Sequence, residues 1–76
     1  MILTIEFDTT DHSEVAICFD AEGLNLLLSK LEYLKTHIDH LHLLTPSWAG
    51  NELSEDKMGG ERYELINSLR IVRVPG

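Results

Sequence analysis

Apolar residues recur at spacings of three and four between residues 21 and 35, which is the spacing of one face of an α-helix. The positions concerned are Leu24, Leu27, Leu28, Leu31 and Leu34. Asp20 comes just before this segment, and its carboxylate can accept hydrogen bonds from the free N–H groups of the first turn. The pattern therefore predicts an amphipathic helix whose leucine stripe, with Leu28 at its centre, packs on a sheet.

Alternation of apolar and polar residues predicts strands on both sides of this helix. The predicted strands are residues 2–8, 15–19, 38–45 and 63–74. A polar, turn-forming segment joins the first two strands into a hairpin. Pro46 ends the third strand because proline has no N–H for the ladder. Asn67 and Ser68 mark a bend or bulge within the last strand.

The order strand, strand, helix, strand, strand predicts an α+β fold, with one domain over residues 1–76. We expect an antiparallel-rich four-stranded sheet with the helix packed on one face. A single helix cannot cover both faces of such a sheet, so apolar residues should be exposed on the other face. These residues are Ile2, Ala16, Cys18, Leu44, Val72 and Val74. An apolar patch of this kind often marks an interface.

The segment from residue 47 to residue 62 has no sustained periodicity and predicts an exposed loop, with a short helical turn near residues 53–58. Its acidic residues are Glu52, Glu55, Asp56 and Glu61. Trp48 lies at its start and has two interpretations. It either fills the edge of the core, which is the preferred interpretation, or forms an exposed anchor for a partner, because tryptophan is enriched among interface hot spots.

Charge and cysteine content limit the kinds of partner and the cellular compartment that we expect for this protein. Thirteen acidic and six basic residues give a net charge of −7, which disfavours binding to nucleic acid and anionic membranes and favours basic partners. The single cysteine, Cys18, cannot form an internal disulfide, and no leader or membrane-spanning run is evident. We therefore expect a cytoplasmic protein.

Two histidines are the best candidates for chemistry. His40 and His42 are two residues apart on a predicted strand, so both rings point to one face, as a zinc site could use. Further ligands are only candidates, such as Glu6 or His12, so structural hydrogen bonds or partner contacts are the favoured roles of these histidines. We predict no metal and no other cofactor.

Nucleophilic catalysis has less support in the sequence. Cys18 lies among apolar neighbours with no flanking base, which indicates a structural thiol. Asp11, His12 and Ser13 are the residue types of a catalytic triad, but adjacent residues in a turn point in different directions. No catalytic residue is therefore predicted, and we expect a protein that is not an enzyme.

Residues 40–48, His-Leu-His-Leu-Leu-Thr-Pro-Ser-Trp, followed by Gly50, Glu52 and Leu53, resemble the motif region of a family of predicted bacterial immunity proteins. It is the thirty-second numbered immunity protein family of polymorphic toxin systems. The resemblance includes the helix over residues 20–34. It implies a protein that binds and neutralises a cognate toxin and has no catalytic activity.

This resemblance and the acidic charge together suggest a basic toxin, such as a nuclease, as the partner. The predicted partner-binding residues are His40, His42, Trp48, Glu52, Glu55, Asp56 and Glu61. Two alternatives stay open. One is a small metal-binding protein or enzyme built on the face of His40 and His42, and the other is a structural homodimer that pairs through its exposed sheet face.

Overall fold

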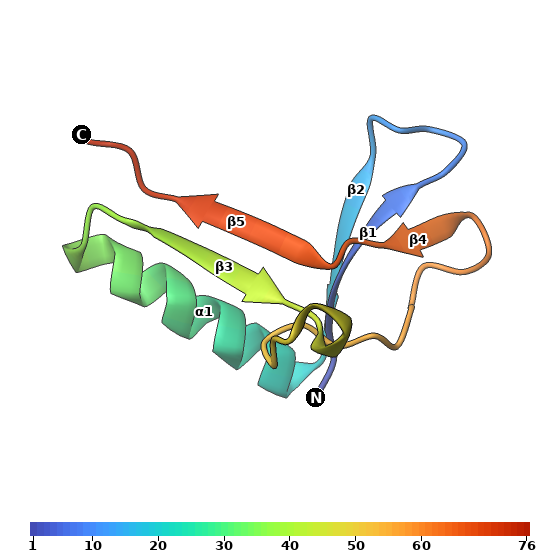
Figure 1. The fold of residues 1–76 in the computed structure, drawn as a ribbon, viewed down its shortest axis with the longest axis horizontal. Coiled ribbons are helices and arrows are strands. Elements are labelled where there is room, and N and C mark those ends of the chain that lie inside the picture. The colour runs from blue at the N-terminus through green and yellow to red at the C-terminus, as the bar shows by residue number, and fades with distance from the viewer.

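A computed structural model describes residues 1–76 and has one α-helix among antiparallel strands (Figure 1). The elements are β1 (Leu3–Asp8), β2 (Val15–Phe19), α1 (Ala21–Thr36), β3 (His40–Leu44), the 3-10 turn η1 (Pro46–Trp48), β4 (Tyr63–Leu65) and β5 (Ser68–Val72). The predicted α+β class and first hairpin are confirmed. The predicted helical turn near residues 53–58 is wrong, because the only short helical turn forms at Pro46–Trp48.

The strands form two sheets rather than the single four-stranded sheet that we predicted. One sheet has the order β2-β1-β4, and the other contains β3 and β5. The predicted last strand is divided where the chain leaves one sheet for the other. The Ile66 N–H donates to the Ile5 carbonyl (2.7 Å), and the next carbonyl, of Asn67, accepts from the Thr45 N–H (3.0 Å). The predicted bend at Asn67 is thus confirmed, and it is sharp enough to separate β4 from β5 (Figure 1).

A segment of the loop explains why the last strand turns away from β1. The Ser54 N–H donates to the Leu3 carbonyl (2.8 Å), and the Leu3 N–H donates to the Ser54 hydroxyl (2.9 Å). Ser54 therefore occupies the edge of β1 that the last strand would need in a continuous sheet. β4 pairs only with residues 6–8 of β1, and β5 pairs with β3 instead.

The core lies between the two sheets and α1. Its fully buried members are Leu3, Ile5, Leu43 and Leu53, and the partly buried residues packed against them are Leu26, Leu27, Leu41, Ile66, Leu69 and Ile71. Leu3 and Ile5 come from one face of β1. The register places Phe19 opposite Leu3 and Ile17 opposite Ile5, so β2 presents these side chains on the same side of the sheet as α1.

Helix α1 begins as predicted, because the Asp20 carboxylate accepts a hydrogen bond from the Gly23 N–H (2.8 Å). Its buried side centres on Gly23 and Leu34. Leu28 is 51% exposed, so its predicted place in the core is wrong, and Leu31 is also exposed. The reason is geometric: the buried face of the helix contains Gly23, Leu26, Leu27 and Leu34, so it is rotated about the helix axis from the predicted leucine stripe.

The exposed apolar surface also differs from the prediction. Val72 and Val74 are exposed as expected, but Ile2, Ala16, Cys18 and Leu44 are partly buried. The hairpin instead exposes the opposite face of β2, which carries Val15, Ile17 and Phe19. No helix in the structure has both the length and the apolar character needed to cross a membrane.

Candidate partner-binding surface

The connection from η1 to β4 has no regular secondary structure, yet it is fixed to the rest of the domain at several points. Leu53 is 2% exposed, and its N–H donates to the Leu44 carbonyl (3.1 Å). Ser54 pairs with Leu3 as described above. Further along, the N–H groups of Met58 and Gly59 reach a buried carboxylate on β1. We call residues 46–62 the anchored loop, because these contacts define its shape.

The buried carboxylate belongs to Glu6, which has no exposed surface. It accepts hydrogen bonds from the Thr4 hydroxyl (2.5 Å), the Met58 N–H (2.9 Å) and the Gly59 N–H (2.8 Å). Burial acts to raise the pKa of Glu6, but these donors favour the charged form and together hold the pKa below its ordinary value. Glu6 therefore fixes the loop as an anion without a basic partner.

Glycine is required at position 59 for this contact. A Cβ atom at Gly59 would lie 2.8 Å from the nearer Glu6 oxygen and 2.6 Å from Cγ of Tyr63. Both distances are shorter than real Cβ contacts allow. The backbone can approach the carboxylate only because this residue has no side chain.

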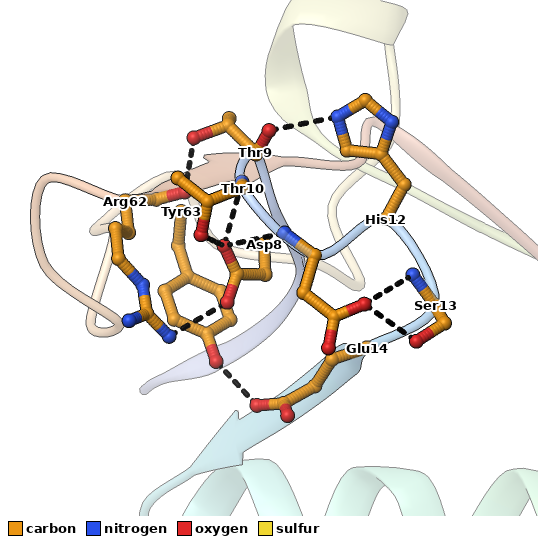
Figure 2. Close-up of polar contacts among 9 residues, drawn as sticks. Asp8, Thr9, Thr10, His12, Ser13, Glu14, Arg62 and Tyr63 are labelled. Carbon is orange, nitrogen blue, oxygen red and sulfur yellow. Dashed lines mark hydrogen bonds and ion pairs between the residues drawn. The ribbon is translucent and has the colours of Figure 1, made fainter.

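A second buried carboxylate, that of Asp8, joins the β1–β2 turn to the end of the anchored loop (Figure 2). One of its oxygens accepts from the Thr10 N–H and hydroxyl, each at 2.8 Å, and from the Asp11 N–H at 3.2 Å. The other oxygen accepts from the Arg62 guanidinium at 2.7 Å. The Thr10 N–H is the largest cause, and with the other donors and the Arg62 charge it outweighs burial and lowers the pKa of Asp8 to about 2.

Two further contacts hold the end of the anchored loop to the β1–β2 hairpin. The Arg62 carbonyl accepts from the Thr9 N–H (2.7 Å) and from the Thr9 hydroxyl (2.6 Å). The Tyr63 hydroxyl donates to the Glu14 carboxylate, an interaction that raises the pKa of Tyr63 (Figure 2). The end of the loop is therefore held to the hairpin by both main-chain and side-chain bonds.

Trp48 is 58% exposed at the end of η1, so the preferred interpretation as a core residue is wrong. Next to it, the Ser47 hydroxyl and N–H donate to the Glu55 carboxylate at 2.5 and 3.2 Å. Glu52 is partly buried, and its carboxylate accepts from the Asn51 N–H (2.9 Å). Burial acts to raise the pKa of Glu52, but nearby main-chain N–H groups and the charge of Lys30 lower it overall. The fold thus brings Glu55 to the turn that carries Trp48.

The other two predicted acids of the loop are Asp56 and Glu61. Both are exposed and belong to no salt bridge. Glu61 precedes Arg62, so it lies at the end of the loop that the Asp8 carboxylate holds. These two carboxylates are free to contribute to the electric field of the loop.

His40 and His42 are exposed on β3, and their ring centroids are 5.2 Å apart in an edge-to-face arrangement. Nδ1 of His40 lies 3.5 Å from the Asp39 carboxylate, and His42 faces Arg70 across the ladder. Nowhere in the chain do three His, Cys, Asp or Glu side chains gather in a group that could hold a metal ion. Glu6, a candidate further ligand, is buried and already bonded by its three donors.

The residues with nucleophilic potential also make other contacts. Ser13 donates to Asp11 through its hydroxyl (2.6 Å), whereas Nε2 of His12 lies 2.8 Å from the Thr9 carbonyl and not against Ser13 (Figure 2). The arrangement lacks the serine–histidine contact that a triad needs. Cys18 is partly buried on β2 and lies opposite Thr4 of β1 in the ladder.

Sequence reasoning missed the importance of Glu6, Asp8 and Arg62. The alternation along residues 2–8 predicts that Thr4, Glu6 and Asp8 share the face opposite Leu3 and Ile5, which is correct, but a polar face is ordinarily exposed. The one available signal was Gly59-Gly60, with Arg62 two residues further on, since glycines permit close approach of the main chain to an anion. The sequence does not show which anion these glycines approach, because Glu6 lies more than fifty residues away along the chain.

The chain matches no protein-family model, no curated protein and no solved structure. Its resemblance to the immunity protein family therefore stays a prediction, and the geometry of the surface has to carry the functional argument.

Proposed function

We propose that this chain is an immunity protein, which binds and neutralises a cognate bacterial toxin without catalysing a reaction. The observation that carries the proposal is Trp48, an exposed tryptophan on an acidic loop that is fixed to the core. The resemblance of residues 40–53 to the immunity family supports the same conclusion.

An anchored loop suits binding because little conformational entropy is left to lose. Glu6 and Ser54 already hold the main chain, so a partner does not have to order it. Trp48 supplies a large apolar ring that a partner can cover, and tryptophans in this role often dominate the binding energy.

Charge favours a basic toxin. The chain carries a net charge of −7, and the Glu55, Asp56 and Glu61 carboxylates are exposed on the anchored loop. Such a field attracts a basic protein, for instance a nuclease, before contact is made. His40 and His42 on β3 form a second proposed region of contact, which is exposed and flanked by Arg70.

The first test measures association with the cognate toxin, which is to be sought first in the adjacent gene. Glu52→Gln, Glu55→Gln, Asp56→Asn and Glu61→Gln, combined in one variant, should slow association roughly tenfold at low salt and flatten its salt dependence, because long-range charge acts on encounter. Surface-binding kinetics at low and high salt give both quantities. The amides keep the size of the side chains, so the loop contacts of Glu52 and Glu55 lose charge but little shape.

A variant with the same change in net charge elsewhere is the matched control. Asp11→Asn, Glu22→Gln, Glu32→Gln and Glu64→Gln alter four exposed acids outside the loop. This control should slow association less than the loop variant does. Equal effects of the two variants would show that the loop has no special part in recognition.

The second test concerns short-range contact. Trp48→Ala should leave association nearly unchanged and speed dissociation by about thirtyfold or more, which is the effect of losing a hot spot. Val74→Ala, at an exposed apolar position far from the loop in sequence, should change neither rate appreciably. Wild-type dissociation in the Trp48→Ala variant would exclude Trp48 as the anchor, and absence of any binding by the wild type would overturn the proposed function.

A further inference from the structure

Strand β2 is an edge strand with no charged residue. It lies at one end of the order β2-β1-β4, and its sequence is Val-Ala-Ile-Cys-Phe. Natural edge strands usually carry a lysine, a proline or a bulge that prevents pairing with another chain. β2 has none of these, so its open edge requires an explanation.

The main-chain groups on this open edge can be identified from the ladder with β1. The Asp8 N–H donates to the Glu14 carbonyl, and the Asp20 N–H donates to the Ile2 carbonyl, each at 3.1 Å. Because bonding alternates along an antiparallel strand, even-numbered residues of β2 bond to β1. The N–H and C=O groups of Val15, Ile17 and Phe19 therefore point away from β1, and no loop or cap hydrogen bond uses them.

The side chains of the same three residues are also open to solvent. Val15 is 55% exposed, and Ile17 and Phe19 are each 48% exposed. They lie on the side of the sheet where α1 packs. An unpaired edge and an uncovered apolar row thus coincide on one strand.

We propose that β2 pairs with β2 of a second copy of this chain, antiparallel, about a two-fold axis at Ile17. In this register Ile17 lies opposite Ile17 of the second copy, and Val15 lies opposite Phe19. Every outward N–H and C=O of the three residues then has a partner. The two three-stranded sheets join into one continuous sheet, and the inference does not depend on the proposed toxin.

In other registers, fewer main-chain N–H and C=O groups of β2 find a partner on the second β2 strand. A shift by two residues in one direction places Phe19 opposite Ser13, and a shift in the other direction places Val15 opposite Ala21. Either shift leaves one of the three residues without a β2 partner and separates the apolar rows. The register centred on Ile17 is therefore the one in which all three outward residues of β2 pair with one another, and it has the two-fold symmetry of a closed dimer.

The apolar contact in this dimer is small, so its main-chain hydrogen bonds contribute much of the specificity. Val15, Ile17 and Phe19, each exposed by about half, offer about 200 Å² per copy if a whole side chain offers roughly 100–200 Å². This apolar area lies below that of a standard interface of about 1,600 Å², and the main-chain bonds of the paired edge add to it.

Charge opposes this pairing at the two ends of the strand. Glu14 lies opposite Asp20 of the second copy in the proposed register, and each chain carries a net charge of −7. Added salt screens both repulsions. Dimerisation should therefore strengthen as salt rises, which is the opposite of the behaviour expected for association with a basic toxin.

The experiment measures solution mass by light scattering for the full chain and two variants. The wild type should give twice the chain mass of 8.6 kDa. Ile17→Lys should give a monomer with an unchanged circular dichroism spectrum, because it places two like charges at the axis. Val72→Lys is the matched control, since Val72 is a similarly exposed apolar residue on the other sheet, and this variant should remain a dimer.

A disulfide tests the register itself. Ala16 and Cys18 of the second copy form a non-hydrogen-bonded pair in the proposed ladder, with Cα atoms about 4.5 Å apart, which a disulfide can bridge. Ala16→Cys should therefore give a covalent dimer on mild oxidation, whereas Ala16→Cys combined with Cys18→Ser should not. A monomeric wild type, a dimer that survives Ile17→Lys, or failure of Ala16→Cys to cross-link would each overturn the proposal.

Discussion

Two buried carboxylates on β1 connect this first strand to the anchored loop. Glu6 accepts the N–H groups of Met58 and Gly59, and Asp8 accepts the Arg62 guanidinium. A buried charge is costly unless it is bonded, so each of these anions requires its distant donors. The position of the anchored loop is therefore coupled to the ionisation of two side chains.

Acid should weaken the fold through Asp8. The pKa of this carboxyl is about 2 in the folded protein and 3.8 ordinarily, so the unfolded chain takes up its proton at a higher pH. Its contribution to the free energy of unfolding is complete above about pH 4 and is lost as the pH falls to about 2. Thermal unfolding measured between pH 7 and pH 2 should show this loss.

Asp8→Asn tests the assignment to this residue. The variant should be less stable than the wild type at pH 7, with a shallower decline toward pH 2, because it cannot take up that proton. Glu6, whose pKa is also lowered, leaves part of the decline in place. Asp56→Asn, at an exposed residue, should follow the wild type, and a wild-type slope in Asp8→Asn would assign the acid dependence to other groups.

The alternating faces of β1 could be predicted from the sequence, but their burial could not. Periodicity separates Glu6 and Asp8 from Leu3 and Ile5 correctly, because it reports which side chains share a face. Whether a face is covered depends on contacts between residues more than fifty positions apart, such as Glu6 with Met58. For the same reason Trp48 could not be assigned to core or surface before the loop was placed.

At the scale of elements, α1 approaches β1 most closely at Gly23. A Cβ atom there would lie 1.7 Å from the Ile2 carbonyl oxygen and 3.2 Å from Cβ of Leu3. The first contact is with main chain and cannot be relieved by a rotamer change. Glycine therefore determines how close the helix lies to the first strand.

Gly23→Ala should destabilise the protein, although alanine is the better helix former. The gain in helix propensity is about 1 kcal/mol, and displacing α1 from β1 should cost more than this, for a net loss of roughly 1–3 kcal/mol. Chemical denaturation measures the change. Asn25→Ala makes a matched control on the exposed side of the same helix and should be neutral or slightly stabilising.

The elements themselves were largely predictable, and their grouping into sheets was not. Local patterns located the hairpin, the helix with its Asp20 cap and the bend at Asn67. The division into two sheets depends on Ser54, a loop residue that pairs with Leu3 and displaces the last strand. The leucine stripe gave the direction of α1 but could not show that Leu28 would lie outside the contact with the sheet.

At the scale of the whole molecule, the domain is extended for its length. Its radius of gyration is 12.9 Å, whereas a typical domain of this size has about 11.4 Å. The long dimension is 39 Å against 26 and 23 Å for the others. The long axis follows α1, β3 and β5, whereas β1, β2 and β4 lie together at one end of it (Figure 1). The elongated shape therefore reflects the division of the strands into two sheets.

The central position of β1 has a consequence for the order in which the chain can fold. β1 is made first, but its partner β4 and the donors for Glu6 and Asp8 are made last. During synthesis the hairpin and the helix can form early. At that stage Glu6 and Asp8 have only the local donors Thr4, Thr10 and Asp11, and β3 has no partner because β5 has not been made. Contacts between such distant segments slow folding because a long loop must close first. The nascent protein therefore passes through a stage at which the uncharged edge of β2 is exposed before the domain is complete, and this is the stage at which aggregation is most favoured.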